Sequence, residues 1–309
     1  MNPTYEGRPL AKPDEELVDQ GLQFDIVTLM GRRGLLALLG GAGALALTGC
    51  ASAAVSSAAS AGTTSTAASQ AASSATAASS GTLTEIPDET AGPYPGDGSN
   101  GPDVLEQAGI VRQDIRSSFG TSAATAAGVG MTLTLKLVNM AQSNVPYAGA
   151  AVYAWHCDQQ GRYSMYSSGI TQENYLRGVQ VAGADGTVTF TSIFPGCYSG
   201  RWPHIHFEVY PDVASIIDAT KAVSTSQVAL PQAECQAVYG TTGYESSGPN
   251  LAQVSLATDN VFGDDSGRTQ LATLTGSTSA GYTAVLTVGV DTRTTPTSGG
   301  APGGRPTSR

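Results

Sequence analysis

The feature that most constrains the fold is a series of short segments in which apolar and polar residues alternate. The clearest of them runs over the eight residues from Met131 to Val138. Alternation with a period of two is typical of strands that bury one face. Turn-forming Gly, Pro, Asp and Asn separate the segments. We therefore predict an all-β domain, an antiparallel β-sandwich with long loops and few short helices, one of them within 213–230. The other segments expected to form strands are 151–156, 162–166, 187–193, 202–209 and 280–290.

This domain does not need the whole chain. Within 51–83, 30 of the 33 residues are Ala, Ser, Thr or Gly, which leaves almost nothing to bury. We expect 50–83 to be a disordered tether and the Thr-, Pro- and Gly-rich segment 292–309 to be a disordered tail. The folded unit is then 84–291.

The first 49 residues are expected to direct export. Arg32 and Arg33 precede an apolar run of 13 residues that ends at Leu47, which is too short to cross a bilayer as a helix. The arginine pair resembles a twin-arginine export signal, and the run up to Cys50 resembles a bacterial lipobox. The alternative, a buried helix, is disfavoured by the glycines in the run. We expect a cell-surface lipoprotein anchored through Cys50, or an extracellular protein.

Charge excludes two classes of partner. The chain has 25 acidic and 15 basic side chains, a formal net charge of −10, and no basic cluster. Such a chain is a poor ligand for nucleic acids and for anionic lipid surfaces. A lipid on Cys50 is the only membrane contact that we expect, and the oligomeric state stays open.

Two of the three histidines stand two residues apart. His204 and His206 lie in a segment expected to be a strand, where residues i and i+2 project from the same face. Two imidazoles on one face are a common start for a metal site, although paired surface or core histidines are also frequent. His156 is the third histidine, and Glu208 joins this face only if the strand stays regular.

The sequence around these histidines resembles the intradiol ring-cleavage dioxygenases, typified by protocatechuate 3,4-dioxygenase and catechol 1,2-dioxygenase. The resemblance covers about 90–280 and carries several motifs in the family's order. The matching pieces are Pro146-x-x-Gly149-Ala150, Val152-x-x-Trp155-His156, Gly161-Arg162-Tyr163-Ser164, Pro195-Gly196-x-Tyr198 and Arg201-x-x-His204-Ile205-His206-Phe207.

The resemblance implies one Fe(III) per chain, held by Tyr163, Tyr198, His204 and His206. Ferric iron is a hard ion that favours anionic oxygen, and a cation of that charge deprotonates the tyrosines that coordinate it. The implied substrates are a catechol-type aromatic and O2. The implied reaction inserts both oxygen atoms and opens the ring between the two hydroxyl-bearing carbons, which yields a muconate-type diacid.

Further roles follow from the same resemblance. Arg201 is expected to stabilise charge that develops on the ring, and Tyr198 to leave the metal and take a substrate proton. Gln227 corresponds to a glutamine beside the metal, although its separation from His206 is longer than expected. Tyr94 is a candidate for the pocket wall, with an exposed aromatic in a turn as the alternative. Trp202 departs from the family pattern and is expected to reshape the pocket wall.

Three cysteines remain after Cys50, namely Cys157, Cys197 and Cys235. In an oxidising compartment the simplest expectation is one disulfide and one buried thiol, with the pairing left open. Two other classes of function stay under consideration. One is a non-catalytic surface β-sandwich that binds aromatic or plant-polymer ligands, and the other is a zinc or copper enzyme built on the two histidines.

Overall fold

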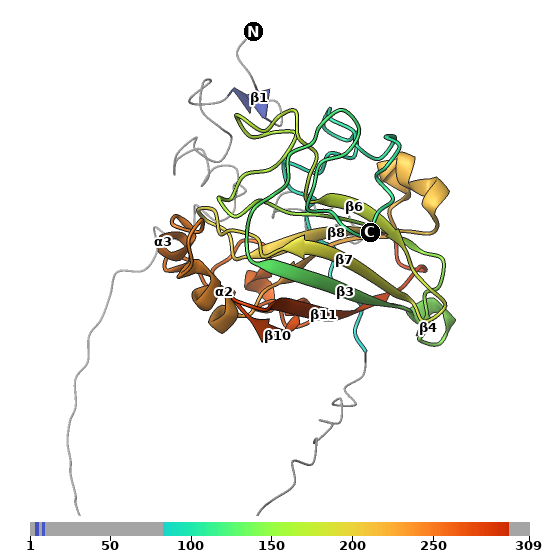
Figure 1. Ribbon diagram of the computed structural model, residues 1–309. Coiled ribbons are helices and arrows are strands. Elements are labelled where there is room, and N and C mark those ends of the chain that lie inside the picture. Colours follow the sequence, from blue (N-terminus) through green and yellow to red (C-terminus); the bar gives the residue numbers. More distant parts are fainter. Residues whose placement is uncertain (1–3, 6–7, 10–82, 297–309) are drawn as a thin grey trace, which may run out of the picture. The chain divides into compact units, whose positions relative to one another are not determined.

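The computed structural model describes residues 4–5, 8–9 and 83–296 (Figure 1). Two short strands, β1 (Thr4–Tyr5) and β2 (Arg8–Pro9), pair with each other in antiparallel orientation. The apolar run before Cys50, nearly all of the predicted tether and most of the predicted tail lie outside the described residues. Within them, no helix is long and apolar enough to cross a membrane.

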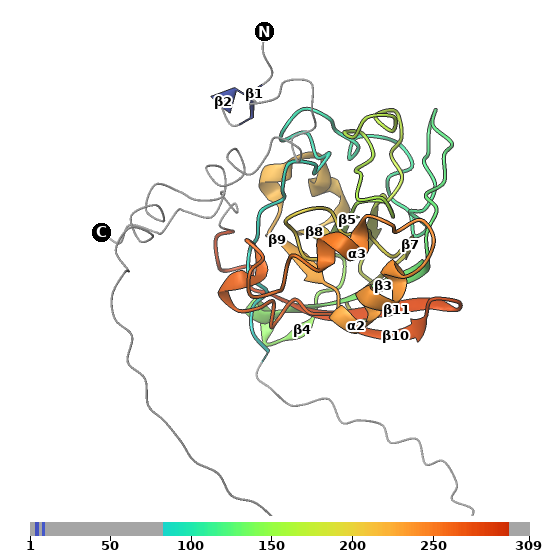
Figure 2. The same cartoon turned by 90° about the vertical axis from the view of Figure 1, so that its left-hand side faces the viewer.

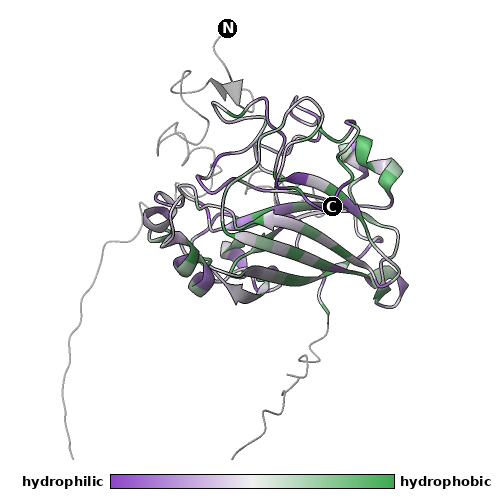
Figure 3. Cartoon of the chain, viewed as in Figure 1, coloured by the Kyte–Doolittle hydropathy of each residue, from purple (hydrophilic) through white to green (hydrophobic). Residues whose placement is uncertain are grey.

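The first sheet of the domain is built around β3 (Gly130–Asn139), the strand predicted from the longest alternating segment. It pairs with β11 (Gly281–Val290) in parallel and with β7 (Thr187–Ile193) in antiparallel orientation. One edge is β10 (Thr273–Ser277), beside β11. At the other edge, β4 (Val145–Pro146) and β7 pair with different parts of β3. Figure 3 shows hydrophobic residues alternating with paler ones along these strands.

The second sheet has the order β6–β5–β8–β9 and is antiparallel throughout. Its strands are β6 (Arg177–Val181), β5 (Ala151–Trp155), β8 (His204–Tyr210) and β9 (Ser224–Ala229). The main core combines residues of both sheets, among them Leu133 and Leu135 of β3 with Ile205 and Phe207 of β8. The β-sandwich prediction is therefore confirmed, with the parallel β3–β11 pair as a departure from a purely antiparallel order.

Strand β8 is buried along its whole length, on both faces. Its odd-numbered residues face the main core, whereas Tyr210 belongs to a second cluster with Tyr153, Trp155 and Tyr163. Loops and the N-terminal segment of the domain form this second cluster with the far face of the sheet. The two histidines consequently lie in an enclosed layer outside the sandwich.

Short helices connect the strands (Figure 2). Two α-helices follow β9 and lie before β10, and the 3-10 helices are one or two turns long. Their bounds are η2 Met140–Gln142, η3 Val213–Ile217, η4 Ala219–Lys221, α2 Gln232–Tyr239, α3 Ser247–Leu251 and η5 Phe262–Asp264. The helix expected within 213–230 thus corresponds to η3 and η4 only, because 224–229 forms β9.

The predicted strand 162–166 is wrong, because this segment is a series of turns. Local side chains satisfy its backbone: Asp158 Oδ1 accepts from Arg162 N at 3.0 Å, and Ser167 Oγ accepts from Tyr163 N at 3.0 Å. Met165 has a φ of 72°, in the left-handed region that no strand residue adopts. The turns direct Tyr163 toward β8.

The expected disulfide is also absent from the described residues. Cys157, Cys197 and Cys235 are all buried and all free thiols. Cys157 and Cys197 each direct Sγ toward a backbone carbonyl, of Gly196 and Arg201 respectively, at 3.5 Å. They behave as small apolar side chains with weak donors.

Candidate metal centre

The regular pleat of β8 brings the two imidazoles together. His204 Nε2 and His206 Nε2 lie 3.1 Å apart, and both side chains are buried. His204 Nδ1 is 2.5 Å from the carbonyl oxygen of Trp202, an acceptor, so Nδ1 carries the proton and Nε2 presents a lone pair. Glu208, two residues further on, is buried and accepts from the Tyr210 hydroxyl at 2.7 Å.

The two tyrosines approach the histidines from different loops. Tyr198 Oη lies 3.2 Å from His204 Nε2. The Tyr163 ring lies edge-on to Tyr198 and to His206, with centroids 5.9 and 6.2 Å away. Its hydroxyl is buried and has no hydrogen-bond partner. The structure thus brings together all four residues that the resemblance implied as ligands.

The donor set fits a metal ion. Two donors that each lie about 2.1 Å from one ion are separated by roughly 3.0–3.4 Å. The Tyr198–His204 and His204–His206 separations of 3.2 and 3.1 Å fall in this interval. An unpartnered buried hydroxyl is costly, and a metal ion would satisfy Tyr163 Oη. Among the described residues no three His, Cys, Asp or Glu side chains cluster in this way, so the further donors here are phenol oxygens.

Burial sets the protonation states of the four side chains. It holds the pKa of His204 and of His206 well below the usual value, and the Arg201 charge lowers both further. The imidazoles are therefore neutral, which is the form that binds metals. Burial also raises the pKa of Tyr163, and raises that of Tyr198 to about 12. The phenols stay protonated unless a cation replaces their protons.

Arg201 forms a buried ion pair beside the tyrosines and histidines. Its Nε donates to Asp259 Oδ2 at 3.0 Å, and its Nη2 donates to Gln227 Oε1 at 2.7 Å. Asp259 also accepts from the backbone N–H groups of Trp202, Val261 and Phe262. The guanidinium is thereby held in one orientation. No sequence motif marked Asp259, which lies in a loop far along the chain.

Gln227 lies directly opposite His206 in the β8–β9 ladder. Its Nε2 donates to the carbonyl oxygen of Thr90 at 2.9 Å, which ties the N-terminal segment of the domain to the site. The long separation in sequence is taken up by η3 and η4 in the β8–β9 connection. It does not displace Gln227 from His206.

The segment 89–97 crosses the cluster of tyrosines and histidines. A Cβ on Gly92 would lie 3.3 Å from His206 Cε1, so the backbone packs directly on the imidazole, with φ at 73°. The Tyr94 ring lies 4.9 Å from the Tyr163 ring and 5.1 Å from that of Tyr166. Tyr94 is thus next to the candidate ligands, in line with its expected place at a pocket wall.

The remaining aromatic candidates have different surroundings. Trp155 stacks on His206, whereas the imidazole of His156 hydrogen-bonds to Ser192 Oγ and to the carbonyl oxygen of Cys157. Trp202 lies in the main core and donates from Nε1 to the carbonyl oxygen of Leu230 at 2.9 Å. The structure therefore gives Trp202 a core position, contrary to its expected place in the pocket wall.

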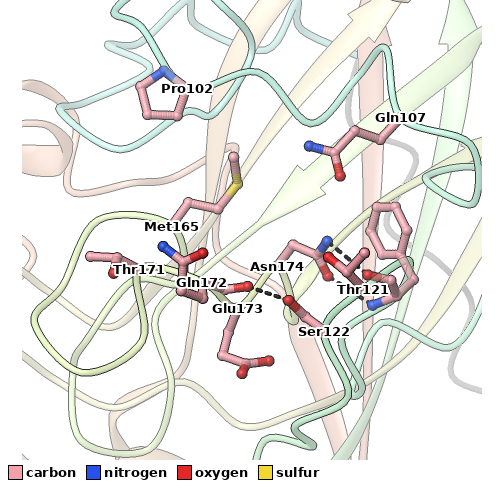
Figure 4. A pocket seen from close by; sticks show the side chains of 10 residues that line it. Pro102, Gln107, Thr121, Ser122, Met165, Thr171, Gln172, Glu173 and Asn174 are labelled. Carbon is pink, nitrogen blue, oxygen red and sulfur yellow. Dashed lines mark hydrogen bonds between the residues drawn. The ribbon is translucent and has the colours of Figure 1, made fainter.

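A separate pocket of about 320 Å³ lies between the loops 102–122 and 165–174 (Figure 4). Its lining is mostly polar and includes Gln107, Gln172 and Glu173. Asn174 in its floor is already bonded to both backbone groups of Phe119. None of the predicted site residues lines this pocket.

Comparison with known proteins agrees with this geometry. Residues 99–212 match the model of a family described as Dioxygenase. Chlorocatechol 1,2-dioxygenase of Rhodococcus opacus is 30% identical over 89 residues, which are 23% of this chain and 35% of that relative. The alignment therefore spans about a third of the relative's length.

Two solved structures have the same fold. An intradiol ring-cleavage dioxygenase from Tetranychus urticae superimposes with a TM-score of 0.55 and 24% identity, over 68% of this chain and 96% of that one. A second solved dioxygenase gives a TM-score of 0.54 and 23% identity, over 68% and 95% of the two chains. The family match over 99–212 and the shared fold show that this domain is similar to the intradiol ring-cleavage dioxygenases.

Proposed function

We propose that this protein is a non-haem Fe(III) dioxygenase that opens a catechol ring between its two hydroxyl-bearing carbons. The observation that carries the proposal is the convergence of Tyr198 Oη, His204 Nε2 and His206 Nε2 at 3.1–3.2 Å, beside the buried, unpartnered hydroxyl of Tyr163. The four side chains would hold one ferric ion per chain. When bound, the ion would accept electron density from the catecholate and so activate the ring toward O2.

One of the two tyrosines is better placed to deprotonate the substrate. Tyr198 is partly exposed whereas Tyr163 is buried, so Tyr198 Oη is the better placed of the two to take a proton from an incoming catechol hydroxyl. In the iron-loaded protein, the tyrosinate of Tyr198 and a hydroxide would each take one catechol proton. The catecholate dianion would then replace two anions, so the charge of the site would stay nearly unchanged and deprotonation would be possible near neutral pH.

Arg201 supplies a fixed cation. Its guanidinium is oriented by Asp259 and Gln227, so it stabilises negative charge that develops on the ring without reorganising. Gly92 packs on His206 and Tyr94 packs on Tyr163, so this segment would help to exclude water from the site.

A visible spectrum tests the proposal. Purified protein should contain about one iron per chain and be red-brown through tyrosinate-to-iron charge transfer. Its spectrum should change when catechol is added without oxygen, and admission of O2 should yield a muconate. A colourless protein loaded with zinc or copper would favour the metal-enzyme alternative, and colourless protein that still binds catechol would favour the non-catalytic binder. A semialdehyde product would contradict cleavage between the hydroxyls.

We also propose that the chain is exported by the twin-arginine pathway and anchored at the cell surface through a lipid on Cys50. The Arg32-Arg33 pair and the short apolar run that ends before Cys50 support this proposal. Mass spectrometry of the mature N-terminus checks it. An unprocessed Met1, or a mature terminus other than an acylated Cys50, would contradict it.

A further inference from the structure

We infer that the site selects catechols whose ring carries no anionic substituent. The inference rests on the proposed ring-cleavage function and names the class of substrate that the site admits. It follows from how the structure uses its buried positive charges.

Arg177, from β6, is the most deeply buried cation of the described residues, with 1% of its surface exposed. A guanidinium has five N–H donors, and each of these five has an acceptor already. Nε donates to Ser164 Oγ, Nη1 to the Pro95 carbonyl and to Tyr153 Oη, and Nη2 to the carbonyls of Tyr94 and Ser164, at 2.7–3.1 Å. Arg177 therefore has no donor left for a substrate carboxylate.

Arg201 is engaged in a different way. Asp259, whose side chain is 0% exposed, balances its charge, and Gln227 takes a further donor. The Arg201–Asp259 pair as a whole is therefore neutral. Such a pair can stabilise negative charge that develops on the ring during the reaction, through its oriented dipole. It attracts a substrate carboxylate only weakly.

The other basic residues of 83–296 do not supply a cation that could bind a substrate carboxylate. Arg112 donates to the backbone carbonyls of Ser117, Asn174 and Arg177. Arg116, Arg162 and Arg293 are at least 40% exposed and paired with Asp114, Asp158 and Asp291. The last three are exposed, namely Lys136, Lys221 and Arg268.

The surroundings of the site already disfavour a carboxylate. Glu89 is half-buried next to Thr90, whose carbonyl accepts from Gln227. Burial, and then the charge of Asp264, raises the pKa of Glu89 to about 8 despite the nearby Arg201. The described domain, 83–296, carries 19 acidic and 9 basic side chains, so its overall field also opposes an approaching anion. A substrate carboxylate that lies near Glu89 would also be partly desolvated and close to Asp264, and the described residues offer it no free cation.

A matched pair of substrates tests the inference. 3,4-Dihydroxybenzoate and 3,4-dihydroxybenzamide have nearly the same size and differ in charge. Anaerobic titration of the iron-loaded full chain, followed by its visible spectrum, gives a Kd for each, and O2 consumption gives kcat/KM. We expect the amide to bind at least tenfold more tightly than the acid, and catechol to bind at least as well as the amide. The difference should persist in 0.5 M salt, because the filled arginines act locally.

Two lysine variants test whether the selectivity arises at the candidate site or from the overall charge of the protein. Glu89→Lys puts a cation beside Arg201 and should narrow the amide-to-acid ratio. Glu106→Lys introduces a lysine at an exposed position and should leave the ratio unaltered. The Kd for catechol reports whether each variant keeps an intact site.

The outcomes separate the inference from the proposed function. Equal or tighter binding of the acid overturns the inference while cleavage of catechol continues. A ratio that falls to one in high salt, or that responds equally to both lysine variants, overturns the local origin of the selectivity. Failure of catechol itself to bind overturns the proposed function and the inference with it.

Discussion

Trp155 and His206 stack almost in parallel, with ring centroids 4.9 Å apart and an angle of 6° between the planes. They are direct partners in the β5–β8 ladder, and Tyr153 stacks on Trp155 at 4.8 Å. His206 Nδ1 is buried and has no hydrogen-bond partner, so packing rather than a hydrogen bond fixes the plane of this imidazole. A metal-binding histidine is usually oriented by a hydrogen bond. Here stacking on the Trp155 indole orients His206.

Removal of the stack should loosen iron binding. Trp155→Leu leaves His206 free to rotate, and we expect iron affinity to fall by about 10–100-fold, the range found when groups that orient metal ligands are lost. Trp155→Phe keeps an aromatic face and should fall by less. Competition with a chelator measures both. Wild-type affinity in Trp155→Leu would show that the strand alone orients the imidazole.

The two clustered histidines should differ sharply from the third. His204→Ala removes a donor whose Nε2 lies 3.1–3.2 Å from two others, so the protein should lose its iron. His156→Gln is the control, because His156 is equally buried but is bonded to Ser192 and Cys157. It should keep its iron. Metal analysis decides, and iron retained in His204→Ala would refute that ligand assignment.

Tyr198→Phe should change the colour and slow turnover. The variant lacks the phenol oxygen that contributes to charge transfer and that accepts the substrate proton. Iron should still bind through the other three residues. The absorption spectrum and O2 consumption measure the two effects. An unchanged spectrum would exclude Tyr198 as a ligand.

Asp259→Asn should reduce kcat more than it raises KM. The substitution removes the negative partner of Arg201 and weakens the bonds that orient the guanidinium, so stabilisation of the reacting ring should fall by about 10–100-fold in kcat. Iron content should stay near one per chain because Asp259 is not among the candidate ligands. Steady-state kinetics and metal analysis check this. An unaltered kcat would show that the Arg201–Asp259 ion pair has only a structural role.

Arg177→Met should destabilise the domain strongly. It removes the donor from five acceptors, of which the Pro95 carbonyl keeps another donor, Tyr153 Oη. The expected cost is about 3–5 kcal/mol in the free energy of unfolding. Arg177→Lys retains the charge but has only three donors, so its free energy of unfolding should lie between those of the wild type and Arg177→Met. Arg116→Met breaks an exposed ion pair, worth at most about 1 kcal/mol, and serves as the control. Urea unfolding measures all three.

Glu89 should make stability depend on pH. Its folded pKa of about 8 lies above the ordinary value of 4.5, so the folded chain binds a proton more tightly than the unfolded chain. The contribution is fully present below about pH 4.5 and is lost as the pH rises toward 8. Because solvent reaches part of the group, we expect Glu89→Gln to gain about 1 kcal/mol relative to wild type between pH 5 and 8.5, or 2–4 °C in Tm. A difference in Tm that does not change with pH would contradict this.

Local pattern was sufficient for part of the fold. Alternation identified β3 and β7, because each of these strands buries a regular set of side chains, and β5, β8 and β11 were also predicted as strands. Alternation did not identify β6, which begins with Arg177 and Gly178. It also did not identify β9, whose first four residues, 224–227, are polar and are mostly buried. A strand that is covered on both faces by polar contacts has no alternation to detect.

The sequence by itself determined the sandwich and the family motifs, and it placed His204 and His206 on one face, because a strand's two-residue period is a local property. Tertiary structure decided the rest. Gln227 stands opposite His206 because the β8–β9 ladder sets the pairing, whatever the length of the connection. Asp259 became the partner of Arg201, and Arg177 the anchor of Tyr94 and Pro95, through contacts between distant segments. Such contacts depend on how buried donors find acceptors in three dimensions, and no local pattern encodes them.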